Sequence, residues 1–126
     1  MIEAYFSALE NALRDFPAIR SYELTRKVYN LQQGFIGGKI AFENDHSLEF
    51  IEVVDAERDG KLKYRYQYMD QAKNLIFRYD NAPHHPQIRS FPHHKHLPEG
   101  LAESQEPTLM DVLFEISKKT HKKGID

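Results

Sequence analysis

The sequence contains no cysteine, and this absence removes several kinds of chemistry at once. Without thiols the chain forms no disulfide, offers no thiolate nucleophile and lacks every zinc site that requires sulfur. A chain of this composition is compatible with a reducing cytosol.

Long apolar runs are also missing. No stretch approaches the roughly twenty apolar residues that a membrane span needs. Residues 1–16 carry three acidic side chains and lack the basic start and apolar run of a signal peptide. The length of 126 residues suits one domain. We therefore expect a single domain over 1–126, located in the cytoplasm and without a membrane partner.

Two kinds of motif are missing as well. Gly34, Gly37 and Gly38 lack the spacing of a phosphate-binding loop, which argues against a nucleotide-dependent modifying enzyme. No helix carries two histidines around a glutamate at metal-ligand spacing, so the sequence predicts neither a metal nor another cofactor.

Apolar residues recur at helical spacing at both ends of the chain. The first such stretch predicts an amphipathic helix over 2–15, which Pro17 ends. Near the other end, Thr108 and Asp111 have the spacing of a capping box and predict a helix over 108–119. A basic tail is expected over 120–126.

The period changes to two between residues 22 and 81, where short aromatic and β-branched segments are separated by turn residues. The connections are too short for helical crossovers, so the strands are expected to form an antiparallel meander. This predicts an α+β fold with a five-stranded sheet, whose strands are 22–30, 35–42, 47–54, 62–69 and 75–80.

The two faces of this sheet have different compositions. Tyr64, Tyr66 and Tyr68 alternate with polar residues and are expected to turn toward the core. The opposite face of the sheet then carries Lys63, Arg65, Arg78 and Asp80.

A loop predicted over 82–107 is the most unusual part of the chain. Residues 77–100 hold five of the seven histidines and four of the six prolines. Proline restricts its own backbone and that of the preceding residue, so the loop is expected to be ordered and to hold its imidazoles in place. Residues 58–98 also carry eight basic and three acidic side chains, which makes this segment the most basic one.

Such a set of side chains fits metal-independent RNA cleavage. Imidazoles act as acid or base near neutral pH, and cations stabilise the phosphate. The catalytic candidates are His84, His85, His93, His94 and His96. The substrate-binding candidates are Arg78, Tyr79, Asp80, Arg89 and Lys95.

Two other interpretations remain open at this point. His94 and His96 lie on one side of an extended segment and, with Asp80, could bind a metal ion. Alternatively, the imidazoles only cap the loop, and the loop binds another protein without catalysis.

The run YRYQYMDQAKNLIFRYDNAPHHPQIRSFPHHKHLPEG, followed by PTLMDVLFEI, resembles the TumE family of toxins. The resemblance covers residues 64–116 and is densest in FRYDNAPHH and FPHHKH. It implies a small toxin of a type II toxin–antitoxin system, neutralised by an antitoxin with a helix-turn-helix domain. It assigns no catalytic residues.

Resemblance and loop chemistry together predict a toxin that arrests growth by cutting RNA. In this hypothesis His84 and either His93 or His94 form the acid/base pair. Arg78 and Lys95 bind phosphate, while Tyr79 and Asp80 orient imidazoles or bind the ribose. An unpaired edge strand would also allow a homodimer.

Overall fold

The computed structural model describes residues 1–125, and side chains as far as residue 119. In chain order the elements are α1 (Ile2–Asp15), β1 (Ile19–Val28), β2 (Gln33–Phe42), β3 (Ser47–Asp55), β4 (Lys63–Met69), β5 (Leu75–Asp80), β6 (His94–Leu97), β7 (Gly100–Glu103) and α2 (Leu109–Ile125). The two helices lie at the ends of the chain and the strands between them, which confirms the predicted α+β class.

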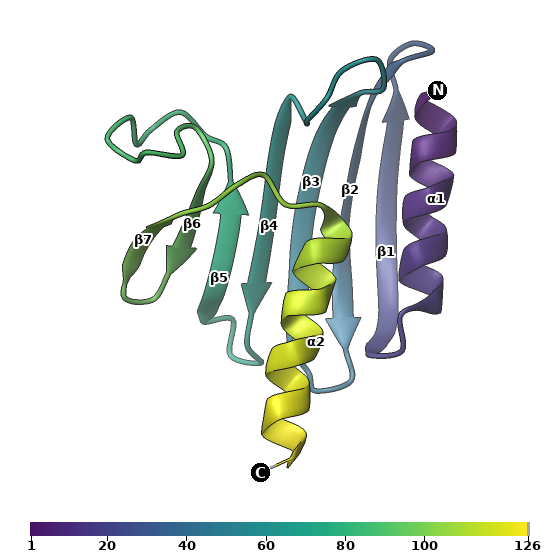
Figure 1. Ribbon diagram of the computed structural model, residues 1–126. Helices are drawn as coiled ribbons and strands as arrows, with labels where there is room; N and C mark the ends of the chain where they lie inside the picture. Colours follow the sequence, from purple (N-terminus) through teal and green to yellow (C-terminus); the bar gives the residue numbers. More distant parts are fainter. Residues whose placement is uncertain (126) are drawn as a thin grey trace.

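The strands form one antiparallel sheet in which every strand pairs with its neighbours in the sequence, from β1 to β7 (Figure 1). The predicted meander is confirmed. Short connections make this the simplest order, because each strand turns back beside the one before it.

The prediction of five strands was wrong, because the sheet has seven. β6 and β7 lie inside the segment predicted as a loop over 82–107. Each has only four residues, and neither shows the β-branched alternation that identified the other strands. Pairing of β6 with β5, and of β7 with β6, therefore determines the conformation of these strands more than their own sequence does.

Both helices begin where the sequence predicts them, to within one residue. α1 has the predicted bounds, Ile2–Asp15. At the start of α2, the Thr108 amide donates to Asp111 Oδ2 over 2.9 Å and the Asp111 amide donates to Thr108 Oγ1 over 3.0 Å. This reciprocal cap confirms the predicted capping box. α2 continues to Ile125, beyond the predicted end at 119, while Asp126 and the side chains of the predicted tail lie outside the described residues.

One face of the sheet packs against both helices. The core is built from apolar residues of α1, β2–β5 and α2. The ring of Phe16, which follows α1, meets the ring of Phe114 of α2 edge to face. Gly34 of β2 allows α1 to lie close, because a Cβ there would come within 3.0 Å of the Phe6 ring and 2.6 Å of the Lys27 carbonyl oxygen. Burial of this face supplies the main stabilisation of the fold.

A buried carboxylate interrupts the apolar core. Glu52 of β3 is completely buried and accepts hydrogen bonds from the hydroxyls of Tyr66, over 2.5 Å, and of Tyr5 in α1. Burial and the nearby Glu52 raise the pKa of Tyr66, so this phenol stays protonated and donates. The carboxylate thereby links the N-terminal helix to two central strands.

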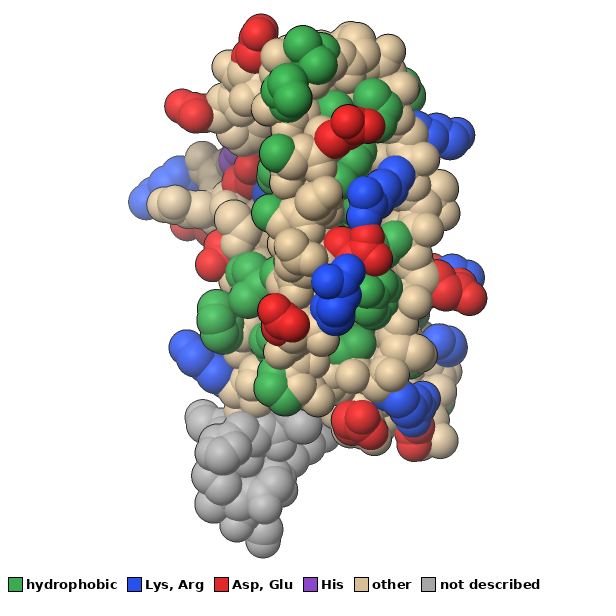
Figure 2. Space-filling model, turned by 90° about the vertical axis from the view of Figure 1, so that its right-hand side faces the viewer, with side chains coloured by type: hydrophobic (Ala, Val, Ile, Leu, Met, Phe, Trp, Pro, Cys, Tyr) green, Lys and Arg blue, Asp and Glu red, His purple; other side chains and the backbone are tan. Residues whose placement is uncertain are grey.

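The other face of the sheet carries no helix (Figure 1). Seen from the side of α1 and β1, acidic and basic side chains are interspersed among apolar ones (Figure 2). Across the described residues, neither helix is long and apolar enough to cross a membrane.

Tyr66→Phe is expected to lower the free energy of unfolding by about 1–3 kcal/mol, because the buried Glu52 carboxylate loses a donor. Chemical denaturation measures the change. Tyr29→Phe is the matched control, since Tyr29 is 58% exposed, and it should change stability by less than about 0.5 kcal/mol. Equal effects of the two substitutions would contradict a stabilising role for the Glu52 contacts.

Candidate functional site

Strand register brings polar residues from separate strands into one row on the helix-free face. Arg65 of β4 lies opposite Asp80 of β5, and Asp80 lies opposite His94 of β6. Arg78 of β5 lies opposite His96 in the adjacent row. Because alternate residues of a strand share a face, these side chains all leave the sheet on the side away from the helices.

Asp80 is the centre of this arrangement, and it is only 6% exposed. Its Oδ1 accepts a hydrogen bond from the Ala82 amide over 3.0 Å and lies 2.8 Å from His94 Nε2. Its Oδ2 lies 3.1 Å from Arg78 Nε and 3.4 Å from His96 Nε2. The Ala82 amide and Arg78 donate to this carboxylate and two imidazole nitrogens lie beside it, and these contacts compensate for its burial.

The ring of His94 is 2% exposed and contacts an oxygen at each nitrogen. Nδ1 lies 2.9 Å from the Pro92 carbonyl oxygen and Nε2 lies 2.8 Å from Asp80 Oδ1. A carbonyl oxygen only accepts, so Nδ1 carries a hydrogen. The Pro92 carbonyl and the Asp80 carboxylate therefore fix the orientation of the His94 ring.

His85 and His96 complete a cluster of three imidazoles. The His94 and His96 ring centroids are 4.8 Å apart, and His85 lies 5.0 Å from the first and 5.7 Å from the second. Burial, together with the Arg78 guanidinium, lowers the pKa of His96, and Asp80 opposes this shift. The His96 ring is thus biased toward its neutral form, which has one nitrogen able to accept a proton.

The segment between β5 and β6 holds His85 in place through a series of turns. The His84 amide donates to the Ala82 carbonyl over 2.9 Å, and the Ile88 amide donates to the His85 carbonyl over 3.2 Å. Ser90 Oγ donates to the His93 carbonyl over 2.5 Å. Local hydrogen bonds thus fix the path of the loop, as its proline content predicts.

A cavity of about 310 Å³ opens above the cluster. Its walls include the three clustered imidazoles, Asp80 and Arg78, together with His84, Lys63 and Arg65. Ile51 and Arg65 also line a second cavity of about 440 Å³, which lies over β1–β4. The two hollows therefore adjoin along the helix-free face.

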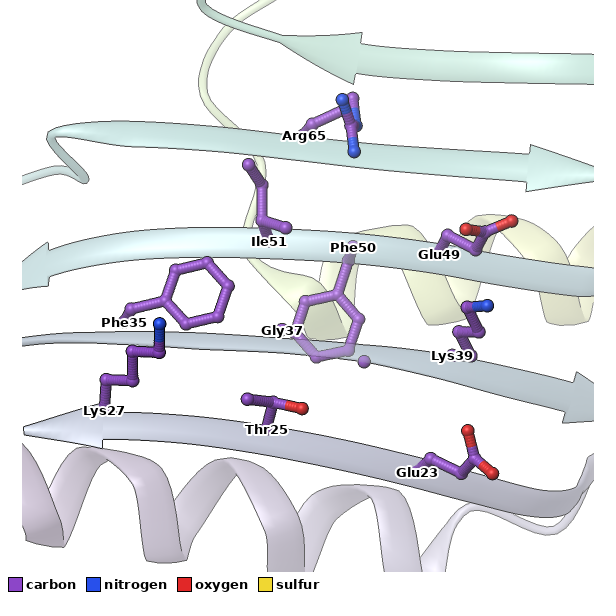
Figure 3. A pocket seen from close by; sticks show the side chains of 11 residues that line it. Glu23, Thr25, Lys27, Phe35, Gly37, Lys39, Glu49, Phe50, Ile51 and Arg65 are labelled. Carbon is purple, nitrogen blue, oxygen red and sulfur yellow. The ribbon is translucent and has the colours of Figure 1, made fainter.

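The second cavity has an aromatic side chain at one end. Phe35 and Lys27 lie together there, while Glu23, Lys39 and Glu49 lie at the other end (Figure 3). Gly37 leaves room for the Phe35 ring, because a Cβ at that position would come within 3.0 Å of Phe35 Cζ. A half-buried ring on an open sheet is a surface on which a planar group can stack.

The structure brings together five of the predicted site residues, namely Arg78, Asp80, His85, His94 and His96. His84 lines the same cavity from a more exposed position. It does not belong to the group of imidazoles whose ligand atoms converge.

Tyr79 and Lys95 are not brought to the cluster, because both alternate to the helix face of the sheet. Tyr79 Oη donates to Glu115 Oε1 of α2 over 2.5 Å, and Lys95 Nζ donates to Glu115 Oε2 over 2.7 Å. Their contacts attach β5 and β6 to α2.

His93 and Arg89 also lie elsewhere. The His93 ring stacks on Tyr64 at a centroid distance of 5.8 Å, and its Nδ1 lies 2.9 Å from the Tyr64 hydroxyl. The Arg89 side chain is 90% exposed and lies 3.8 Å from Glu103.

Arg65 and Phe35 belong to the site region although neither was a predicted site residue. Alternation along β4 did place Arg65 on the correct face of the sheet. What the sequence lacked was the register that sets Arg65 opposite Asp80. Nothing in the sequence marked Phe35 except its position beside the glycines of β2.

The cluster also has the composition of a metal site. His85, His94 and His96 each offer one ligand atom, and these atoms lie within 4.8 Å of one another. Neutral imidazole is a common ligand of divalent transition ions. The same side chains can therefore exchange protons or bind a cation.

Asp80→Ala is expected to lower the free energy of unfolding by about 3–5 kcal/mol, because it leaves the buried His94 ring and Arg78 without their carboxylate. Glu103→Gln is the matched control. Glu103 lies opposite His94 in the neighbouring strand, yet its side chain is 57% exposed. Chemical denaturation of both variants should separate them clearly, and similar losses would show that Asp80 is not a buried structural partner.

Comparison with known proteins assigns the chain to a family. Searches of curated proteins and of solved structures found no significant match. A family model described as Toxin TumE matches residues 9–120, which includes every strand, the second half of α1 and most of α2. The resemblance found in residues 64–116 is therefore confirmed and extends over nearly the whole fold. The chain belongs to the TumE toxin family.

Proposed function

We propose that this protein is a growth-inhibiting toxin that cuts RNA with its imidazole cluster and needs no metal ion for the reaction. The observation that carries the proposal is the convergence of His85, His96, the Asp80–His94 pair and Arg78 in one cavity. Membership of a toxin family supports the biological role. The cluster supplies the base, acid and cation that cleavage of an RNA backbone requires.

In the proposed reaction His96 acts as the base. It removes the proton of a ribose 2′-hydroxyl, and the 2′-oxygen attacks the adjacent phosphorus. The bond between phosphorus and the 5′-oxygen breaks, and His85 donates a proton to that leaving oxygen. The products are a 2′,3′-cyclic phosphate and a 5′-hydroxyl, so no water or cofactor is consumed. His94 is a positioning residue, because its ring is buried and holds Asp80.

Cations beside the cluster are suited to the phosphate. Arg78 contacts Asp80 through Nε, and a guanidinium has further N–H donors for phosphate oxygens. Arg65 lines both adjoining cavities and can contact the next phosphate of the chain. These two arginines take the role that the sequence suggested for Arg78 and Lys95.

The adjoining cavity supports single-stranded RNA as the substrate. Phe35 provides a stacking surface and Lys27 a cation beside it, and Arg65 connects this end with the cluster. Aromatic side chains interleaved with basic ones are the usual surface for single strands. Bases would lie on the open sheet while the scissile phosphate enters the cavity of about 310 Å³.

Partners follow from the family assignment. We infer a cognate antitoxin that binds the toxin directly, of the helix-turn-helix type, in the cytoplasm. β1 is paired on one side only among the described strands, which leaves an edge for a second copy or for the antitoxin. Co-purification with the product of the adjacent gene, and the mass of the free toxin in solution, test these two inferences.

His96→Ala is expected to slow RNA cleavage by roughly 10²–10⁴-fold, the usual contribution of one general acid or base. The assay induces the toxin in bacteria and maps new RNA ends that carry 2′,3′-cyclic phosphate. His46→Gln is the matched control, since His46 lies in the turn between β2 and β3 and contacts Tyr68 instead of the cluster.

Loss of growth arrest in His96→Ala, with arrest retained in His46→Gln, supports the proposal. Growth arrest without any new RNA ends would contradict it and favour a toxin that only blocks a partner. Circular dichroism of the purified variants verifies that both remain folded.

Phe35→Ala is expected to raise the KM for a single-stranded RNA while leaving kcat unchanged. Stacking of one base on an aromatic ring contributes about 1–3 kcal/mol to binding. Tyr29→Ala is the control, because Tyr29 is an exposed aromatic residue on the loop after β1. Steady-state kinetics on a short oligonucleotide separates KM from kcat, and an unchanged KM would remove Phe35 from the RNA path.

A further inference from the structure

The cluster contains three imidazoles, one more than an acid/base pair needs. The ligand atoms of His85, His94 and His96 all lie within 4.8 Å of one another. Two of the rings come from alternate residues of β6 and the third from the loop that precedes it. A set of three histidines on two separate segments is a frequent way to hold one cation.

The backbone fixes the orientation of the central ring. His94 Nδ1 donates to the Pro92 carbonyl over 2.9 Å, which leaves Nε2 directed at the cluster. Metal-binding histidines usually donate their second N–H to a carbonyl or carboxylate in this way, because the bond fixes the tautomer and the ring plane.

Asp80 adds a carboxylate at suitable distances. His94 Nε2 and His96 Nε2 lie 2.8 and 3.4 Å from its two oxygens. In a tetrahedral zinc site with bonds near 2.0–2.1 Å, neighbouring ligand atoms are about 3.3 Å apart. The two carboxylate distances are on either side of this value. The imidazole ligand atoms lie within 4.8 Å of one another, so they would move closer by at most about 1.5 Å to surround an ion.

The types of ligand restrict the choice of ion. Imidazole nitrogens suit Zn²⁺, Ni²⁺ and Cu²⁺, whereas Mg²⁺ and Ca²⁺ prefer sets of oxygen ligands. The negative charge of Asp80 offsets part of the charge of the ion, and Arg78 beside it opposes a second cation.

We propose that His85, His94 and His96 form a binding site for one divalent transition ion, with Asp80 as its carboxylate partner, and that the bound ion inhibits the toxin. Inhibition rests on the proposed function. The ion occupies the nitrogen lone pairs of His85 and His96 that proton transfer to and from RNA requires. Binding itself depends only on the geometry of the cluster.

Titration of the metal-free protein with Zn²⁺, followed by calorimetry, tests the binding site without any RNA. One ion per chain is expected. His85→Ala and His96→Ala should each weaken the affinity by roughly 100-fold or more, since even an outer-shell partner contributes 10–100-fold. His84→Ala is the matched control, because it removes the neighbouring imidazole that lies outside the converging group.

Substitution with Co²⁺ adds a spectroscopic test, because tetrahedral coordination by nitrogen gives visible absorption bands that surface binding does not. Bands that appear with one equivalent and vanish in His96→Ala support the site. Absence of binding, or binding that persists in both His85→Ala and His96→Ala, would overturn it. Those two rings are less buried than His94, so their removal avoids the variant that is most disruptive to folding.

The inhibitory role is tested by cleavage of RNA in a chelator and after addition of one equivalent of Zn²⁺. The inference is supported if the toxin cleaves RNA in the presence of the chelator and cleaves it more slowly once Zn²⁺ is added. Cleavage that appears only with Zn²⁺ would overturn both the inhibitory role and the metal-free reaction. Zinc binding with no cleavage under either condition would leave the site established and refute the proposed function on which inhibition depends.

Discussion

The burial of a single carboxylate, Asp80, is the constraint on which the site depends. Its oxygens meet the Ala82 amide, Arg78, His94 and His96, so one side chain fixes the exit of β5, the start of the loop and both imidazoles of β6. A buried carboxylate without such donors would be strongly destabilising. The contacts that stabilise this region of the fold are therefore the same contacts that position the cluster.

Because side chains alternate along each strand, one face of the sheet forms the core and the other carries the candidate site. On one face the tyrosines of β4 and the helices form the core, and Glu115 of α2 holds Tyr79 and Lys95. On the other face lie the imidazole cluster and its neighbours Asp80 and Arg78. The strands that carry the chemistry are thus fixed from behind by helix contacts, which gives the site a rigid support.

Much of the fold was predictable because its signals are local. Helical spacing identified α1, and a capping box identified the start of α2. Turn residues and alternation identified the first five strands. β6 and β7 were missed because four-residue strands between prolines have no pattern of their own, and only the pairing partner determines them.

The sequence predicted which types of residue form the site, but it identified only some of the individual residues correctly. The pattern His-Lys-His places His94 and His96 on one side, and the structure agrees. The same alternation places Lys95 and Tyr79 on the opposite side. The sequence prediction missed this because it grouped all the charged and polar residues of the segment together. Which of the adjacent His84 and His85 turns inward depends on the turns of the loop, and no periodic pattern encodes that choice.

The shortness of β6 limits how this family can change by insertion and deletion. β6 has only four residues, three of them paired with β5 and all four with β7. One added or lost residue would therefore exchange His94 and His96 for the side chains that now face α2. Length variation among related toxins is therefore expected in the turn between β3 and β4, which lies outside the hydrogen-bonded rows of the cluster. The segment from Pro92 to Leu97 should keep a constant length, so its spacing is a more reliable marker of the site than the number of histidines around it.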